Sequence, residues 1–127
     1  MKTKITVVLI LTLFLSFSAF AEAIPKFTIG EVNQKLFDLE GQIFIIEFNR
    51  RSEIKQIAKE VYETTLWGRS AYIDVCFNRN AFDYMEKKIS QRFGKKQPLY
   101  ATIKNSKLVL LGCVAHKDMY GNISFKW

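Results

Sequence analysis

Residues 62–77, YETTLWGRSAYIDVCF, hold the clearest structural pattern in this sequence. Two runs rich in β-branched and aromatic residues are separated by Gly68-Arg69, a pair typical of a tight hairpin turn. In the second run, apolar and polar residues alternate from Ile73 to Phe77, so one face of that strand is expected to be buried. The stretch therefore predicts a β-hairpin.

Further β-patterned runs lie on both sides of this hairpin. Before it, residues 42–48 (QIFIIEF) form a dense β-branched and aromatic run. After it, residues 99–103 and 107–115 flank a turn at Asn105-Ser106, and residues 123–127 (ISFKW) alternate. The chain therefore predicts a mainly β fold in which the last run pairs back onto the sheet.

One helix is expected between the third and fourth strands. Residues 81–93 carry apolar side chains at helical spacing from Phe82 to Phe93, and lysines occupy the opposite face. Asn80 is the expected N-cap, and Gly94 is the expected glycine just past the C-terminus.

Residues 52–62 admit two interpretations. Their apolar residues fall at i, i+3, i+4, i+7 and i+8 from Ile54, which is typical of an amphipathic helix, and Ser52 is a suitable N-cap. Alternatively, residues from Ile57 to Leu66 belong to a strand with weaker alternation. Pattern alone favours the helix.

In order, these segments resemble an OB-fold. The segments that carry the resemblance are LEGQIFIIEF (39–48), YETTLWGRSAYIDVCF (62–77), AFDYMEKKI (81–89) and LYATIKNSKLVLLGCV (99–114). This order is similar to that of small secreted bacterial OB-type domains. The resemblance implies a small five-stranded barrel over residues 39–127, with one helix between strands 3 and 4 and an N-terminal arm at residues 22–38.

The resemblance also bears on residues 52–62. The first strand of an OB-fold is long and coiled, so residues 53–57 would form its second half and turn near Lys59 into the second strand. The strand interpretation is therefore preferred. A helix at these residues would instead give an α+β sandwich, which is the alternative fold.

The first 21 residues have the pattern of a secretory signal peptide. Lys2 and Lys4 are followed by residues 5–20, which carry no charge, and Ala19-Phe20-Ala21 forms a small-residue cleavage site. We therefore expect cleavage after Ala21, a periplasmic or secreted location, and no membrane insertion after cleavage. Export permits a disulfide between Cys76 and Cys113; the alternative is two buried thiols.

Composition limits the function classes. Hydrophobic residues make up 49% of the 127-residue chain, which argues against disorder, and the length allows one domain. Without Lys2 and Lys4 the formal net charge falls from +7 to about +5, which favours anionic partners. No cofactor or metal is expected, because two cysteines and one histidine at these spacings match no zinc pattern.

A binding surface is the main functional prediction. OB-folds bind ligands across their second and third strands, where this chain carries Trp67, Arg69 and Tyr72, with Arg50 and Arg51 nearby if the first strand is long. Such residues stack on bases and neutralise phosphates, or stack on sugars and pair with acidic glycans. Alternatively, the rings only cap the core and the arginines stay solvated.

The expected function is therefore that of a non-enzymatic, OB-type binding domain for an anionic oligomer, either nucleic acid or acidic glycan. The alternative is an exported protein–protein interaction module, such as an inhibitor or envelope scaffold component, which pairs through the strand at residues 123–127. A small hydrolase ranks last, because His116 is the only histidine and no catalytic motif occurs.

Overall fold

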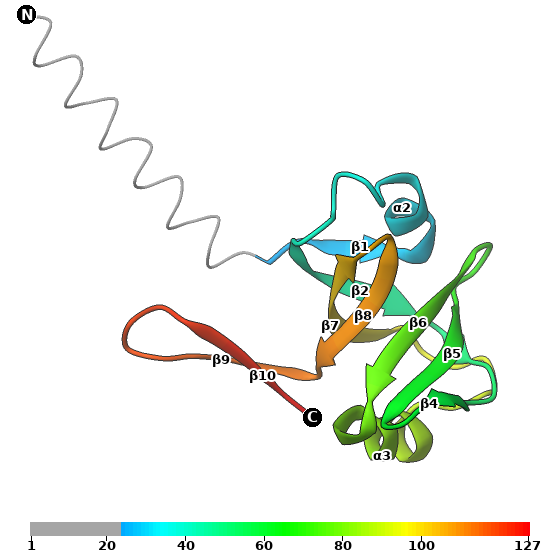
Figure 1. Cartoon of the computed structure of the whole chain (residues 1–127). Coiled ribbons are helices and arrows are strands. Elements are labelled where there is room, and N and C mark those ends of the chain that lie inside the picture. Colours follow the sequence, from blue (N-terminus) through cyan, green and yellow to red (C-terminus); the bar gives the residue numbers. More distant parts are fainter. Residues whose placement is uncertain (1–23) are drawn as a thin grey trace, which may run out of the picture.

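The computed structural model describes residues 24–127; the expected signal peptide at residues 1–21 lies outside this range. The described chain is mainly β, with two short helices and a hairpin that extends away from the body (Figure 1). The elements are β1 (Lys26–Thr28), α2 (Ile29–Gln34), β2 (Ile43–Phe48), β3 (Arg50–Arg51), β4 (Lys55–Ala58), β5 (Val61–Trp67), β6 (Tyr72–Asn78), α3 (Arg79–Lys88), β7 (Gln97–Lys104), β8 (Lys107–Gly112), β9 (Val114–Lys117) and β10 (Ile123–Lys126).

Eight strands form one mixed sheet in the order β1-β2-β7-β8-β6-β5-β3, with β4 also paired to β5. The β1–β2 and β6–β8 pairs are parallel, and the other pairs of this sheet are antiparallel. Within residues 24–127 no pairing joins β1 to β3, so the hydrogen-bonded path is open. The sheet therefore has more strands than the five that the sequence predicts.

The additional strands arise because the predicted first strand is divided. Asn49 and residues 52–54 interrupt it, which leaves β2, β3 and β4. β2 pairs with β7, whereas β3 and β4 pair with β5. One stretch of chain, residues 43–58, therefore supplies strands to two separate neighbours in the sheet.

The helix that periodicity favours at residues 52–62 is wrong, and the strand interpretation is confirmed. β4 occupies most of this stretch, and a turn at Lys59-Glu60, with Glu60 at φ 59°, leads into β5. Ile57 is 52% exposed, so the apolar spacing does not reflect burial on one helix face. Pairing with β5 decides the conformation here, and the α+β sandwich that depends on this helix is excluded.

The core lies under the inward faces of the main sheet. In β6 the alternation predicted from sequence is confirmed, because Ile73, Val75 and Phe77 are buried while Tyr72 is exposed. The largest fully buried side chains are Phe44, Phe48, Ile29, Ile46, Leu66, Met85, Ile89, Leu99, Ile103, Leu108, Val32 and Val75.

The N-terminal arm joins this core. Its β1 pairs with β2, and Ile29 and Val32 of α2 are 1% and 0% exposed. Thr28 caps the helix, because its hydroxyl accepts the Glu31 N–H at 3.3 Å while the Glu31 carboxylate accepts the Thr28 N–H at 3.2 Å. The Thr28 hydroxyl also donates to this carboxylate at 3.1 Å, and the two bonds that it receives from the Thr28 N–H and hydroxyl lower the pKa of the Glu31 carboxyl.

The helix α3 ends earlier than predicted. It begins after Asn78, whose side chain accepts the Ala81 N–H at 3.1 Å, so Asn78 and not Asn80 is the N-cap. It stops at Lys88, and Gly94 does not cap it. The carbonyls of its last turn instead accept hydrogen bonds from Arg51, a residue that lies 34 or more positions earlier in the chain.

The C-terminal strand does not join the main sheet. β10 pairs only with β9, and together they form a separate two-stranded sheet that projects from the body (Figure 1). The base of this hairpin passes so close to Gly112 that a Cβ added to Gly112 would lie 2.7 Å from the Lys126 carbonyl oxygen. The ring centroids of Phe125 and Tyr100 lie 5.2 Å apart, and those of Trp127 and Tyr84 of α3 lie 5.4 Å apart.

The predicted disulfide is absent, and both cysteines are free. Cys76 is directly opposite Val109 in the parallel β6–β8 pair. Cys113 lies four residues further along the chain than Val109. At about 3.3 Å per residue, this separates the two cysteines by roughly 13 Å, well beyond the ~7 Å limit for a bridge. The alternative of two buried thiols holds only in part, because both free thiols are only partly buried.

Candidate ligand-binding surface

The outer face of the β5–β6 pair brings Trp67 and Tyr72 together. The two residues are directly opposite in the antiparallel register, and their ring centroids lie 5.0 Å apart at an interplanar angle of 37°. The next outward pair is polar, with the Thr65 hydroxyl donating to Asp74 at 2.7 Å. Because Tyr72 is 59% exposed, its ring is open to a ligand.

Arg50 extends this aromatic pair on the β3 side. Its guanidinium carbon lies 4.6 Å from the Trp67 ring centroid and 5.0 Å from that of Phe93, so the cation sits between two rings. The Arg50 Nε is buried and has no hydrogen-bond partner. The Trp67 indole N–H is held by the Ser52 hydroxyl at 2.7 Å, which fixes the ring that Arg50 contacts.

Phe93 reaches this surface because a loop, and not a helix, carries it. The Gly94 N–H donates to the Asn49 carbonyl at 3.3 Å, and the Asn49 amide donates to the Gly94 carbonyl at 3.2 Å. These two bonds hold the loop between α3 and β7 beside the β2–β3 junction. Phe93 is 63% exposed there, although the sequence pattern places it on the apolar face of a helix.

Arg69 lies at the other edge of the same surface. It belongs to the loop of residues 68–71, which joins Trp67 to Tyr72 and is closed by the Gly68 N–H donating to the Ala71 carbonyl at 2.8 Å. This loop has four residues, so the predicted two-residue turn is too short. Arg69 also lines a cleft of about 260 Å³. The other residues that line the cleft are Thr28, Ile29, Gly30, Glu47, Asn49, Gly68, Ser70, Ala71 and Lys96.

Arg51 must be removed from the predicted site. Its side chain is 6% exposed and lies inside the molecule. Its Nε donates to the carbonyls of Met85 and Ile89 at 2.8 and 2.9 Å, and its Nη2 donates to the Glu86 carbonyl at 3.2 Å. Burial lowers the pKa of Arg51, and the Glu86 carboxylate partly opposes this. Arg51 therefore stabilises the C-terminus of α3 and cannot reach a ligand.

We call the remaining set the aromatic–basic surface. It contains three of the predicted residues that form one connected group, Arg50, Trp67 and Tyr72, and the predicted Arg69 at its edge. Phe93 and Lys96 also belong to it, although the sequence pattern does not predict them as ligand contacts. The signal that points to them is the cluster RFGKK at residues 92–96, where an aromatic residue stands between cations. The surface is defined by Arg50, Trp67, Tyr72 and Phe93, which contact one another, together with Arg69 and Lys96, which line the cleft beside Asn49 and Gly68.

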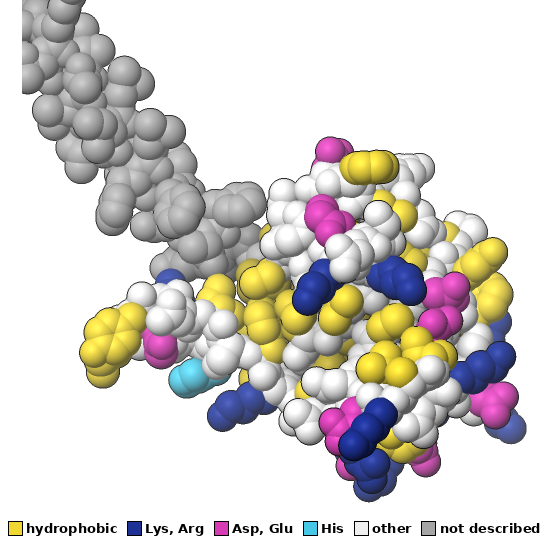
Figure 2. Space-filling model, viewed as in Figure 1, with side chains coloured by type: hydrophobic (Ala, Val, Ile, Leu, Met, Phe, Trp, Pro, Cys, Tyr) yellow, Lys and Arg dark blue, Asp and Glu magenta, His cyan; other side chains and the backbone are white. Residues whose placement is uncertain are grey.

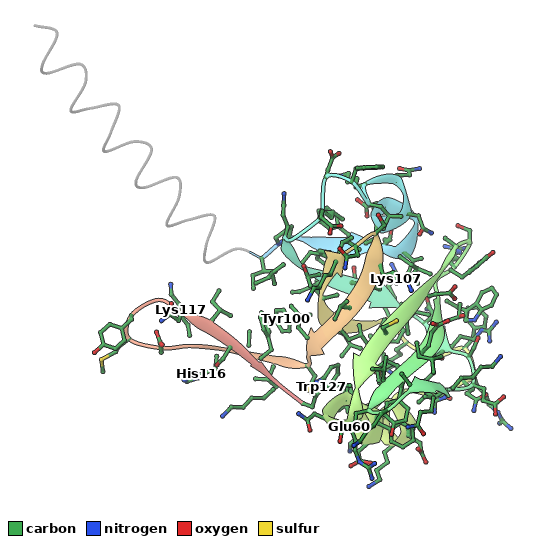
Figure 3. All side chains as sticks on the ribbon, viewed as in Figure 1. Glu60, Tyr100, Lys107, His116, Lys117 and Trp127 are labelled. Atoms are coloured by element: carbon green, nitrogen blue, oxygen red, sulfur yellow. The ribbon has the colours of Figure 1, made fainter. Side chains whose placement is uncertain are left out.

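A second cleft, of about 340 Å³, lies at the β6–β8 seam and contains Cys76. Burial raises the pKa of the Cys76 thiol, and the carboxylate of Glu63 adds to this effect. His116 is not near this cleft; it lies on β9 of the projecting hairpin (Figure 3). Within residues 24–127 no three side chains of the metal-ligating types come together.

Neither helix in the described part of the chain has the length and apolar character of a membrane-spanning segment. No protein-family model matches this sequence, and no curated protein matches it either.

Proposed function

We propose that this protein is an exported, non-enzymatic, OB-type binding domain whose aromatic–basic surface holds an anionic oligomer, with single-stranded nucleic acid favoured over an acidic glycan. The observation that carries the proposal is the Arg50 guanidinium between the rings of Trp67 and Phe93. The leader sequence supports export.

The strand order supports the OB-type part of the proposal. An OB-fold requires its first strand to pair with both the second and the fourth, and its third and fifth strands to be parallel neighbours. Residues 43–58 pair with β5 through β3 and β4, and with β7 through β2. β6 and β8 are parallel, and α3 lies between β6 and β7 in the chain.

The chemistry of the surface supports an anionic ligand with flat rings. Tyr72 and Phe93 leave large parts of their rings exposed at the two ends of the Phe93–Arg50–Trp67–Tyr72 row. Nucleobases stack on such rings, and phosphates pair with nearby cations such as Arg69 and Lys96.

The test is a titration of residues 22–127 carrying Trp127→Phe, so that Trp67 is the only tryptophan. Single-stranded oligonucleotides and an acidic polysaccharide are added in separate arms at low and moderate salt. We expect saturable quenching by the oligonucleotide that weakens as salt rises. Tyr72→Ala should weaken binding by roughly 5- to 150-fold, which corresponds to about 1–3 kcal/mol per stacked base.

Two matched variants serve as controls. Tyr120→Ala removes an exposed tyrosine from the hairpin tip, and Lys55→Ala removes an exposed cation from β4; both should leave binding unchanged, whereas Arg69→Ala should weaken it. Quenching by the polysaccharide alone would reassign the ligand to acidic glycans. No saturable response in either arm would contradict the proposal and favour the protein-interaction alternative.

A further inference from the structure

The tip of the projecting β9–β10 hairpin is a well-ordered turn. The Gly121 N–H donates to the Asp118 carbonyl at 3.1 Å, and Gly121 adopts φ 84°, which favours glycine. One carboxylate oxygen of Asp118 accepts the N–H groups of Tyr120 and Asn122, each at 2.9 Å. The Asp118 N–H donates to the Asn122 carbonyl at 3.0 Å. Most amide protons of the turn are therefore bonded inside the turn itself.

This turn exposes two large apolar side chains. Met119 is 89% exposed and Tyr120 is 83% exposed. Figure 2 shows apolar side chains at the far end of the hairpin, well separated from the body. Two adjacent exposed apolar side chains at a protruding point are available for a contact outside the chain.

A cation accompanies the apolar tip. Lys117 ends β9, and its Cε lies 4.0 Å from where a Cβ on Gly121 would stand, so its stem runs beside the turn. Figure 3 places Lys117 and His116 on the outer part of the hairpin. The Asp118 carboxylate lies in the same turn, but one of its oxygens is bonded to two backbone N–H groups. At the interface of an anionic membrane, aromatic rings lie at headgroup depth and lysines meet phosphates, which suits Tyr120 and Lys117.

We infer that the Met119–Tyr120 tip inserts into the interface of an anionic lipid surface, with Lys117 beside the lipid phosphates. The internal hydrogen bonds of the turn lower the cost of moving its backbone out of water. The separation of the tip from the body lets it reach the headgroups before the polar surface of the domain does. The contact is peripheral and requires no membrane-spanning segment. It is independent of the ligand proposed for the aromatic–basic surface.

The base of the hairpin is attached to the body by several contacts. The pairs Tyr100–Phe125 and Tyr84–Trp127 fix β10 to the body, and the Cys113 N–H donates to the Lys126 carbonyl at 2.9 Å. Hydrogen bonds and ring contacts therefore hold both the base and the tip, which reduces the conformational freedom lost on insertion.

The experiment uses residues 22–127 and vesicles of equal parts phosphatidylglycerol and phosphatidylcholine, some with bromine on the acyl chains. Tyr120→Trp places a reporter at the tip, and the unsubstituted protein, with Trp67 and Trp127 only, is the control. We expect the bromine to quench the added tryptophan strongly and the native tryptophans little. In co-sedimentation, Met119→Ser/Tyr120→Ser should weaken vesicle binding by about tenfold or more.

Charge on the body is separated from insertion by adding Lys96→Ala to the Tyr120→Trp variant. This change removes a cation from the body, so the quenching of the tip reporter in bound protein should be unchanged. Equal quenching of the control and the Tyr120→Trp variant would overturn the inference. Unchanged co-sedimentation of the double serine variant would also overturn it. So would a concentration-dependent dimer, detected by sedimentation without lipid, that the double serine variant abolishes, because the tip would then contact a second copy of the chain.

Discussion

Arg50 and Arg51 are adjacent and have the same side chain, but one lies on the outer face of the sheet and the other is buried. Because successive residues of a strand point to opposite faces, Arg50 lies outward between two rings and Arg51 lies inward under α3. The sequence identifies both as cations near the second strand. It does not reveal which one faces solvent, because that depends on where the strand bends after Asn49.

Arg51→Ala should destabilise the protein strongly. It removes donors to Met85, Glu86 and Ile89 and leaves their carbonyls without these partners at a buried helix end, at a cost of about 2–4 kcal/mol in the free energy of unfolding. Urea denaturation measures the change. Arg51→Lys should recover only part of it, and exposed Arg69→Ala is the control. Equal stability of Arg51→Ala and Arg69→Ala would disprove the capping role.

Cys76 should react slowly with alkylating reagents. Burial and the Glu63 carboxylate raise its pKa, so the folded protein holds less thiolate at neutral pH than a free cysteine does. The rate of iodoacetamide modification, followed by mass spectrometry in a Cys113→Ser background, should therefore rise at a higher pH than for a cysteine peptide. Glu63→Gln should move this rise to lower pH. A profile matching that of the peptide would refute the raised pKa.

At the level of elements, local pattern and final conformation disagree in two places. Residues 52–62 have helical spacing, but residues 55–58 pair with β5, and only part of the apolar set is buried: Tyr62 lies in the core, whereas Ile57 and Val61 are exposed. Residues 89–93 continue the helical pattern of α3 but leave it, because Arg51 takes the carbonyls of the last turn and the Ser90 carbonyl accepts the Arg51 N–H at 3.0 Å. Both departures depend on residues distant in sequence.

The base of the β9–β10 hairpin should be intolerant of a methyl group. In Gly112→Ala the new Cβ would lie under 3 Å from Lys126 backbone atoms, so β10 must move. We expect a loss of about 1–3 kcal/mol and faster hydrogen exchange of the Cys113 amide, whose partner is Lys126. Gly30→Ala, whose nearest atom would be 4.0 Å away, is the matched control. If the Cys113 amide of Gly112→Ala were protected from hydrogen exchange as well as in the unsubstituted protein, the predicted displacement of β10 would be wrong.

For the whole molecule, the sequence alone determined the features that depend on local pattern. It predicted a mainly β chain, the two runs of residues 62–77 as paired strands, and the buried face of β6, because two-residue alternation reports burial directly. It also identified Arg50, Trp67, Arg69 and Tyr72 as candidate ligand contacts from residue type and strand order.

Only the tertiary structure decided the features that depend on distant partners. It placed Arg51 inside and Phe93 outside, kept the two cysteines apart, and separated β10 from the main sheet. Each outcome rests on contacts between segments far apart in the chain: the bond pair of Asn49 and Gly94, the cap of Arg51 on α3, and the crossing of Lys126 over Gly112. Local periodicity contains no information about such contacts, because it reports which residues favour burial and not which segment buries them.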